Sequence, residues 1–440
     1  MLQKNTIIKG AILLTAAGLI GRVIGFFYRI FLSRAIGAEG VGIYQLIFPL
    51  YALTYSLTSS GIQTAISRYV AAKTAAGDPG GARRIFQIGL SISTAASVFI
   101  SFLLLFFYQE LAVSFVKEPR CGQLLYLLAF VVPFGSIHSC INGYYYGIRR
   151  AAVPAITEVI EHLLRLGTVM LIFQILSAKD IAVTPALAVY GMIVEEILAA
   201  LISATALLWH FRSQPKIPAA LYRNSRYARE LFSVSVPLTM NRVLINIFQS
   251  MEAMLIPLQL RLTGLDQHTV LSIYGVLTGM ALPLILFPTA LTSSLCTMIL
   301  PAVSEAQARN EIHSIRSAIK KISFFCIGFG LFFWLLFFFF GNFICMLLFQ
   351  DRMAGSFVTV MAWICPVMYL NPALFAVLNG LGKTKLVFLH NLAGVLTRIL
   401  FILLAIPHFG INGYLMGMAV TQALLFFLST NAIRRVLRRG

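Results

Sequence analysis

Long runs of apolar residues, separated by short polar segments, dominate the chain. Runs of 18 or more apolar residues recur from one end to the other, and a helix of about 20 such residues crosses a hydrocarbon core about 30 Å thick. A barrel strand needs only about ten residues of alternating character. The pattern therefore predicts an all-α integral membrane protein with about twelve transmembrane helices. The predicted spans are 8–33, 43–66, 86–107, 122–147, 154–176, 185–211, 231–257, 273–300, 322–347, 357–380, 386–406 and 412–432.

Composition excludes a soluble domain. Of the 440 residues, 59% are hydrophobic and 11% are charged, whereas a soluble domain has about 45–50% apolar and about 25% charged residues. The histidines and cysteines are scattered without the spacing of metal ligands, so we expect no metal site and no cofactor. No arrangement of nucleophile, histidine and acid is readable either, and we do not expect an enzyme.

The net charge of +19 follows the predicted topology. If the N-terminus is inside and the spans alternate, 23 of the 34 basic residues lie in inner segments, 6 in outer segments and the rest within spans. This asymmetry fits the positive-inside rule and predicts that both termini are cytoplasmic. The basic loops would attract anionic lipid head groups, and no solvated domain remains to bind nucleic acid.

The two halves of the chain resemble each other. We expect an N-terminal six-helix lobe at 1–211, a basic cytoplasmic linker at 212–230 and a C-terminal six-helix lobe with a short basic tail at 231–440. Because six is an even number, both halves share one orientation, and a pseudo-two-fold axis along the membrane normal should relate them. The recurring features are Ile43-Tyr44 and Ile273-Tyr274, Thr58-Ser59-Ser60 and Thr292-Ser293-Ser294, Asn142-Gly143 and Asn379-Gly380, and Arg165 and Arg398.

Charged residues inside the spans are the candidates for a functional site. A charge at mid-membrane costs about 2.5–3.5 kcal/mol on insertion scales, so each is expected to face protein or water. In the first span, Arg22 and Arg29 share a small, polar stripe with Thr15, Gly18 and Gly25. The remaining candidates are Glu158, Glu161, His162 and Arg165 on the fifth span, Glu195 and Glu196 on the sixth, Arg242, Asn246, Gln249 and Glu252 on the seventh, and Arg398 on the eleventh.

The five intramembrane arginines favour an anionic substrate. A guanidinium group stays charged in any surroundings and pairs with phosphate through two parallel hydrogen bonds. Two other interpretations remain open. The arginines could form internal salt bridges, as the acid-first spacing of Glu161 and Arg165 allows, or Arg22 and Arg29 could extend toward the membrane surface. Glu195 and Glu196 point about 100° apart on a helix, so we expect at most one of them to line a cavity.

Several segments resemble a known family. Gly18-Leu-Ile-Gly-Arg22, the stretch from Arg34 to Tyr44, and the loop from Ser67 to Phe86 are similar to the polysaccharide flippases related to stage V sporulation protein B. The segment Ala155-Ile-Thr-Glu158-Val-Ile-Glu161, followed by Arg165, is similar to the fifth span of that group. The group belongs to a superfamily that also includes multidrug exporters and the lipid II flippase.

The resemblance implies a flippase of a bacterial plasma membrane that works by alternating access. Its substrate would be a lipid-linked pyrophosphate precursor of the cell wall or of a polysaccharide. A gradient of Na+ or H+, or the membrane potential, would drive the transport. Arg22 and Arg29 would contact the pyrophosphate, with Arg165, Arg242 and Arg398 contributing positive field. The chain departs from the family in having twelve predicted spans where many members have fourteen, which puts binding of the lipid tail in doubt. A cation-coupled drug antiporter and a non-transporting scaffold of a sporulation or envelope complex are the alternatives.

The charge asymmetry leads to a test of topology. Single cysteines placed at 67–85, 212–230 and 301–321 in a cysteine-free chain should resist impermeant thiol reagents in intact cells, because these loops are predicted to be cytoplasmic. Labelling after the cells are opened is the control. Strong labelling of two of the three loops in intact cells would reverse the predicted orientation.

Overall fold

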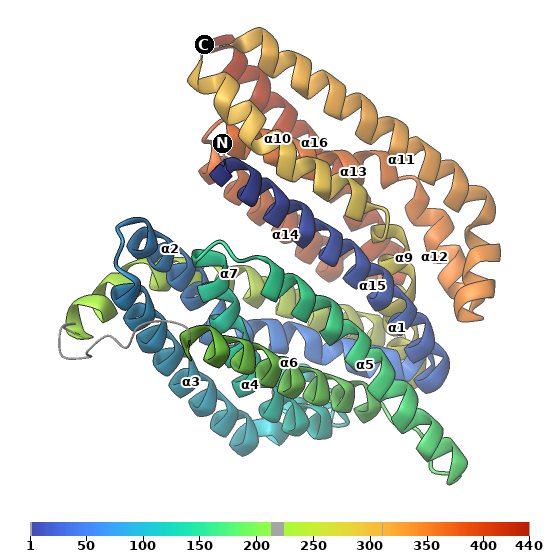
Figure 1. The fold of residues 1–440 in the computed structure, drawn as a ribbon. Coiled ribbons are helices and arrows are strands. Elements are labelled where there is room, and N and C mark those ends of the chain that lie inside the picture. Colours follow the sequence, from blue (N-terminus) through green and yellow to red (C-terminus); the bar gives the residue numbers. More distant parts are fainter. Residues whose placement is uncertain (1, 213–223, 310, 440) are drawn as a thin grey trace. The chain divides into compact units, whose positions relative to one another are not determined.

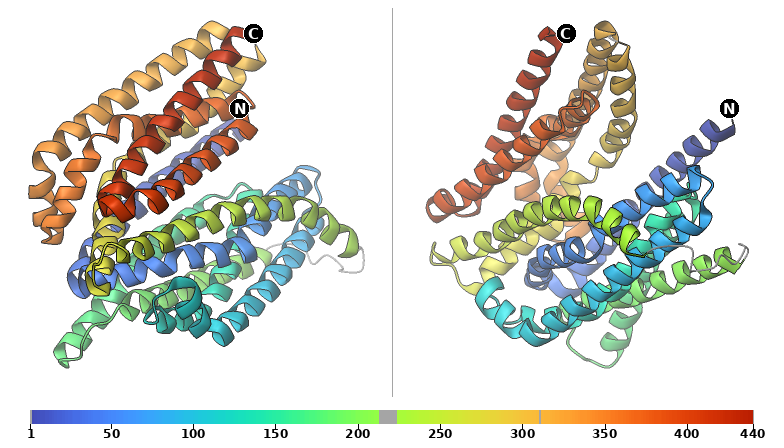
Figure 2. Two further views of the ribbon diagram at one scale, coloured as in Figure 1. Left: turned by 180° about the vertical axis from the view of Figure 1, so that it is seen from behind. Right: turned by 90° about the vertical axis from the view of Figure 1, so that its left-hand side faces the viewer.

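The computed structural model describes residues 2–212, 224–309 and 311–439, and within these ranges the regular structure is helical. Figures 1 and 2 show the elements in three views. The predicted all-α class is confirmed. The elements are α1 (Leu2–Tyr55), η1 (Ser56–Ser60), α2 (Gly61–Ala75), α3 (Pro79–Glu110), η2 (Leu111–Val116), α4 (Cys121–Gly147), α5 (Ala152–Ala178), α6 (Ala186–Arg212), α7 (Asn224–Arg261), α8 (Gln267–Gly275), η4 (Val276–Ala281), α9 (Leu282–Leu286), α10 (Thr289–Ala308), α11 (Ile312–Phe349), α12 (Arg352–Ala362), α13 (Cys365–Gly380), α14 (Thr384–Leu404), α15 (Ile406–Phe409) and α16 (Ile411–Arg439), where η denotes a π-helical turn.

Long apolar helices correspond to most of the predicted membrane spans. Ten helical segments of the described chain are long and apolar enough to span a membrane, and the pair α12 and α13, bent by 62°, makes an eleventh. One of the ten, Ile12–Ala75, has 64 residues, or about 96 Å of helix at 1.5 Å per residue. It is kinked at Gly37 and covers most of the predicted span 8–33 and all of the span 43–66. The described chain thus has ten or eleven candidate membrane spans, against about twelve predicted from the sequence.

The connections between spans are shorter than the sequence indicates. Most of the predicted loop 67–85 is helical, since α2 ends at Ala75 and α3 begins at Pro79. The predicted loop 301–321 is also largely helical, because α10 runs to Ala308 and α11 begins at Ile312. Polar residues at the ends of these spans continue the helix rather than ending it. The predicted linker 212–230 lies partly outside the described residues.

The chain forms two compact units. The first comprises residues 1–28 and 43–250, and the second comprises residues 29–42 and 251–440. Each has its own apolar core. In the first unit, Ile66, Phe86 and Tyr144 pack together from α2, α3 and α4, and in the second, side chains of α10, α11, α13, α14 and α16 do the same. The predicted division into lobes at 212–230 stays a prediction. The two compact units divide within α7, between Ser250 and Met251, so the first part of α7 belongs to the first unit.

The segment 29–42 of α1 packs within the second unit, whereas its neighbours on both sides belong to the first. Arg34 donates from Nε to the carbonyl of Leu348 (2.9 Å) and from Nη2 to that of Leu347 (2.7 Å). These carbonyls lie at the C-terminal end of α11, where a helix leaves acceptors unpaired and favours a positive charge. A Cβ atom at Gly42 would collide with the backbone oxygen of Leu271, so glycine is required for this close approach of α1 and α8.

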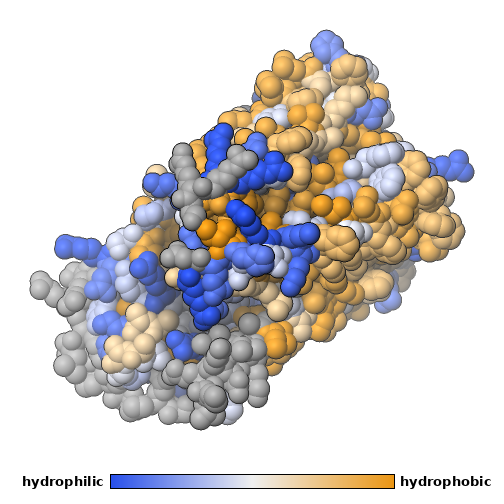
Figure 3. Space-filling view, turned by 90° about the horizontal axis from the view of Figure 1, so that it is seen from above, coloured by the Kyte–Doolittle hydropathy of each residue, from blue (hydrophilic) through white to orange (hydrophobic). Residues whose placement is uncertain are grey.

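Large apolar side chains cover much of the surface, as Figure 3 shows for one face. Phe324 on α11 is 82% exposed, and Phe106 on α3 is 68% exposed. A soluble protein rarely exposes contiguous apolar areas of this kind, whereas the hydrocarbon of a bilayer solvates them. The protein is therefore a multi-pass membrane protein.

The kink at Gly37 leads to a stability prediction. Its φ of 69° and ψ of 176° lie in a region that is open essentially only to glycine, and another residue there costs about 1–3 kcal/mol. Gly37→Ala should therefore lower the melting temperature of the purified protein in detergent. The control is Gly328→Ala in α11, where an added Cβ meets no atom within 4 Å. Equal melting temperatures for the two variants would contradict the strain assigned to Gly37.

Candidate functional site

In the first unit, an arginine from α5 pairs with a carboxylate from α6. Arg165 donates two hydrogen bonds to Glu195, from Nε to Oε2 and from Nη2 to Oε1, the latter at 2.7 Å. Both side chains are largely buried, with 22% and 4% of their surface exposed. The Arg165 guanidinium carbon also lies 5.5 Å from the centre of the Tyr28 ring of α1, within the range of a cation–π contact. The arginine thus ties three helices together.

The other acids of this region have partners of their own. Glu161 lies 3.1 Å from Nδ1 of His138 on α4, an ion-pair distance without hydrogen-bond geometry. Glu196 accepts a hydrogen bond of 3.0 Å from the hydroxyl of Tyr51 on α1. The i,i+4 spacing allows an ion pair between Glu161 and Arg165 on the same helix. In the structure Glu161 instead lies beside His138, and Arg165 pairs with Glu195. Arg165 instead bonds to Glu195 because α5 packs along α6.

The second unit holds a similar arrangement. Arg398 on α14 donates to Glu252 on α7 through Nε (2.8 Å) and Nη2 (3.0 Å). The hydroxyl of Tyr414 on α16 donates to the same carboxylate at 2.9 Å. Glu252 is 8% exposed, so three donors surround its charge in a buried place. A buried carboxylate is tolerated under these conditions because every oxygen has a hydrogen-bond donor.

The two arrangements use the same residue types on different helices. In both units the arginine lies on the fifth span of its predicted repeat, in α5 and in α14. In the first unit the carboxylate comes from the sixth span and the tyrosine from the first. In the second unit the carboxylate comes from the first span of the repeat and the tyrosine from the sixth. The helix positions of the carboxylate and the tyrosine are therefore interchanged between the two units. In both units one arginine is paired with one carboxylate.

The first part of α7 is attached to the π-helical turn η1. Arg242 donates from Nη1 to the hydroxyl of Ser60 (2.5 Å). Asn246, one turn later, donates to the hydroxyl of Ser56 (2.5 Å) and to the carbonyl of Ala52 (3.0 Å). Gln249 has an exposed side chain. The serine hydroxyl that accepts from Arg242 is neutral, so this contact leaves the positive charge of the arginine in place. Arg242 is itself exposed.

The polar stripe of the first span faces α5 over part of its length. A Cβ atom at Gly18 would lie 3.7 Å from Oε1 of Glu158, and one at Gly21 would collide with the ring of His162. Arg22 acts electrostatically on Glu158, and its side chain is exposed. Arg29 is half-buried and belongs to the second unit. In the described part of the chain, no group of three His, Cys, Asp or Glu side chains has the geometry of a metal site.

Several of these partners do not stand out in the sequence. His138 is one of seven scattered histidines, and Tyr28, Tyr51 and Tyr414 lie in apolar surroundings that are typical of packing residues. Ser56 and Ser60 are spaced four residues apart before a glycine, which is a weak signal for a polar helix face. Only the packing of α7 on η1 gives these hydroxyls a role.

Comparison with known proteins places the chain among transporters. Residues 7–307 match the family described as "Polysaccharide biosynthesis protein", and residues 262–404 match the MatE family. The chain is 27% identical to stage V sporulation protein B of Bacillus subtilis over 99% of its own length and 85% of that protein. It is 23% identical to the lipid II flippase MurJ of the same organism over 37% of its own length and 32% of that protein.

Solved structures show the same fold. An inward-facing multidrug-resistance transporter of the MATE family and the MOP superfamily matches with a TM-score of 0.73 at 14% identity, over 98% of this chain and 99% of the other. The lipid II flippase MurJ in an inward closed conformation matches with a TM-score of 0.73 at 14% identity, over 96% of this chain and 87% of the other. The likeness establishes the fold, and the expected arrangement of helices in two lobes fits it.

The buried pair in the second unit leads to a prediction about stability. Arg398→Met leaves Glu252 without its cation, and the loss should amount to about 3–5 kcal/mol of unfolding free energy, seen as a large drop in melting temperature. The double variant Arg398→Met with Glu252→Met should recover most of the loss, because it leaves no buried charge. Arg309→Ala is the control, since Arg309 and its partner Glu305 are more than half exposed. Additive losses in the double variant would contradict the pairing.

Proposed function

Since the chain belongs to the polysaccharide biosynthesis protein family, we propose that it is a flippase for a lipid-linked, pyrophosphate-bearing precursor of the cell wall or of a polysaccharide. The family and the fold support a membrane transporter, and the substrate is the part that we propose. In this proposal the protein lies in a bacterial plasma membrane with both termini in the cytoplasm and exposes its binding site alternately on the two sides. Membrane lipids and a coupling ion, Na+ or H+, would be its other partners.

One observation carries the choice of substrate: the intramembrane arginines fall into two classes. Arg165 and Arg398 each face a carboxylate that accepts two hydrogen bonds from the guanidinium. Arg22 and Arg242 are exposed on helices that are predicted to cross the membrane. An exposed guanidinium in such a segment costs several kcal/mol unless it meets water or an anion. We therefore assign phosphate binding to Arg22 and Arg242, and a holding role to Arg165 and Arg398. Arg29, which is half-buried in the second unit, stays a candidate from the sequence alone.

The geometry of a guanidinium suits this substrate. Its planar fork forms two parallel hydrogen bonds to a phosphate, and its charge does not depend on pH in the physiological range. Transport also requires release, so the anion must be held by few contacts that a change of conformation can break. Side chains that already pair with a buried carboxylate through two hydrogen bonds, such as Arg165 and Arg398, are poorly suited to this step.

The acidic residues of the first unit favour a second candidate, a cation-coupled drug antiporter. Glu158, Glu161, Glu195 and Glu196 outnumber Arg165 on α5 and α6, and such carboxylates could bind Na+, H+ or an organic cation. In the flippase proposal the same acids serve coupling, and Asn246, Gln249 and Glu252 on α7 are further polar candidates. The two functions differ in cargo. An antiporter moves cationic dyes in reconstituted vesicles, whereas a flippase moves labelled lipid-linked sugars.

The decisive variants are at Arg22. Arg22→Ala should leave folding and membrane insertion nearly intact and should sharply reduce movement of a fluorescent lipid-linked pyrophosphate sugar in proteoliposomes. Arg22→Lys should recover only part of the activity, because an ammonium group lacks the bidentate fork. Melting temperature and transport are measured on the same purified samples.

The matched control is Arg165→Ala, which removes an arginine that is held by Glu195. It should lower the melting temperature strongly, since it leaves a buried carboxylate unpaired, whereas Arg22→Ala should not. Normal transport by Arg22→Ala would overturn the assignment of an anion site to the first span. A loss of stability in Arg22→Ala as large as that in Arg165→Ala would instead make Arg22 a structural residue.

A further inference from the structure

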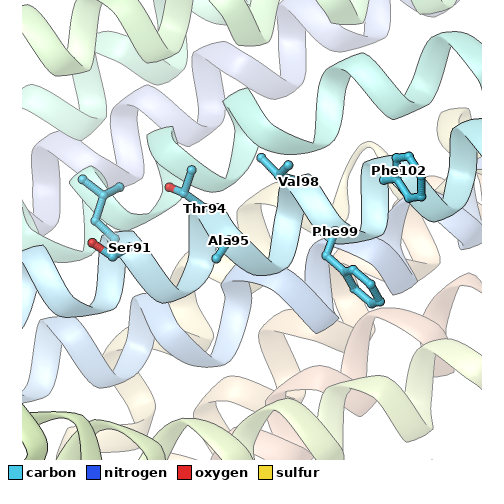
Figure 4. A pocket seen from close by; sticks show the side chains of 7 residues that line it. Ser91, Thr94, Ala95, Val98, Phe99 and Phe102 are labelled. Carbon is cyan, nitrogen blue, oxygen red and sulfur yellow. The ribbon is translucent and has the colours of Figure 1, made fainter.

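A groove of about 820 Å³ lies along α3, where side chains such as Ser91, Thr94 and Phe102 form a row (Figure 4). The residues that line it carry no ionisable group, so the groove offers no charged partner to an ion. Ionisable side chains lie instead in the interior of the first unit. Two of them, His138 on α4 and Glu161 on α5, face each other at 3.1 Å from Nδ1 to Oε1.

The facing atoms of His138 and Glu161 lack any other partner. Both are buried, and among the described residues neither Nδ1 nor Oε1 makes a hydrogen bond. A buried polar atom in this state is costly and needs an explanation. Because 3.1 Å is within the range of an N–H···O hydrogen bond, one proton held between the two atoms would satisfy both.

Asn142 makes this pair suitable for two protonation states. Its Nδ2 forms a hydrogen bond with Nε2 on the far side of the His138 ring. An amide NH2 group only donates, so the ring proton then lies on Nδ1 and faces a charged Glu161. With the amide turned, its oxygen would accept from Nε2–H, and a protonated Glu161 would donate to Nδ1. The two states differ by one proton, and Asn142 can serve both.

The surroundings of Glu161 leave negative charge uncompensated. The charged and titratable groups around it are Glu158, His162 and Arg165 on α5, Glu195 and Glu196 on α6, Tyr146 on α4, and Tyr55 and Arg22 on α1. Arg165 is paired with Glu195, and Arg22 acts on Glu158. Glu161 and Glu196 have no arginine or lysine as an ion-pair partner among the described residues. Binding of a proton would remove one of these buried charges.

The partner of Arg165 fits a protonated Glu161. Glu161 precedes Arg165 by four residues, in the acid-first order that favours an ion pair on one helix. Arg165 nevertheless pairs with Glu195, which the packing of α5 along α6 brings within reach. A neutral carboxyl group at Glu161 does not compete for the guanidinium. A charged one does, so gain and loss of a proton would change the balance between α5 and α6.

The facing atoms suit a proton better than a metal ion. Hard cations such as Na+ select oxygen ligands, whereas the atom that faces Glu161 is an imidazole nitrogen. Among the residues that the structure describes, no group of three His, Cys, Asp or Glu side chains could hold a metal ion.

From this geometry we propose that His138 and Glu161 form a proton-binding site, with Asn142 as their hydrogen-bond partner in both states. On uptake of one proton the carboxylate becomes a carboxyl group, and the ring proton moves from Nδ1 to Nε2. The proton enters through Glu161, whose side chain is 20% exposed, against 8% for His138. In transport, a role that rests on the proposed function, the site makes H+ the coupling ion in place of Na+.

The test is infrared difference spectroscopy of the purified protein between acid and alkaline pH, which detects the carbonyl stretch of protonated carboxyl groups. Glu161→Gln should lose one such band of the wild-type protein. His138→Gln should keep this band at a shifted frequency, because the acid loses its nitrogen partner. Glu305→Gln is the control and should leave the band unchanged, since Glu305 is 65% exposed. Should Glu161→Gln fail to fold, Glu161→Asp should shift the band.

Sodium distinguishes the two coupling ions. Replacing choline by Na+ at constant pH and ionic strength should leave the wild-type band unchanged. Loss of the band in Na+ overturns the proposal, because a metal ion would then displace the proton. An unchanged band in Glu161→Gln, or an unshifted band in His138→Gln, overturns it as well.

Transport is measured separately, in proteoliposomes that contain a fluorescent lipid-linked sugar. A pH gradient should accelerate its movement by the wild-type protein and should have no effect on Glu161→Gln. Sugar movement that ignores the pH gradient would overturn the coupling role while the proposed cargo stands. The expected infrared bands in a protein that moves no lipid-linked sugar would support the proton site and reject the proposed cargo.

Discussion

The cost of placing a charge in a medium that cannot solvate it organises this protein. A lone buried carboxylate or guanidinium is expensive, and the cost falls only when partners supply opposite charge and hydrogen bonds. Glu252 meets Arg398 and Tyr414, and Glu195 meets Arg165. The first set of contacts joins helices that are far apart in sequence, and the second joins the consecutive helices α5 and α6. Because a broken pair costs more than an intact pair contributes, the contacts specify which helices are neighbours.

The same cost separates the arginines that hold the structure from those that are available to a substrate. Arg165 and Arg398 each donate two hydrogen bonds to a buried carboxylate of their own compact unit. Arg22 and Arg242 are exposed in segments that are predicted to cross the membrane. An exposed guanidinium can be reached by a phosphate, whereas Arg165 and Arg398 are held against buried carboxylates. The proposed function follows from this division of roles more than from the number of arginines.

Glycine and serine control how closely the helices approach. At Gly42 the backbone of α8 lies so near that no Cβ fits, and Gly37 allows α1 to change direction. Ser56 and Ser60 present hydroxyls to α7 where η1 widens the helix. In hydrocarbon, where apolar burial gives helices little reason to associate, small residues and interhelical hydrogen bonds supply much of the attraction. The long apolar helices thus acquire specific neighbours from a few small and polar positions.

The sequence by itself determined the class of the protein, because hydrophobic length, charge asymmetry and the cost of a buried charge are properties of the chain alone. Twelve spans and a short list of candidate residues follow from them, with Arg165 and Arg398 as related positions. The partners were decided by tertiary structure. Spacing pairs Glu161 with Arg165, yet the packing of α5 on α6 brings Glu195 to that arginine, and the packing of α7 against α14 and α16 brings Glu252 to Arg398 and Tyr414. An interaction between helices depends on their rotation and depth, and neither is recorded in the local pattern of residues.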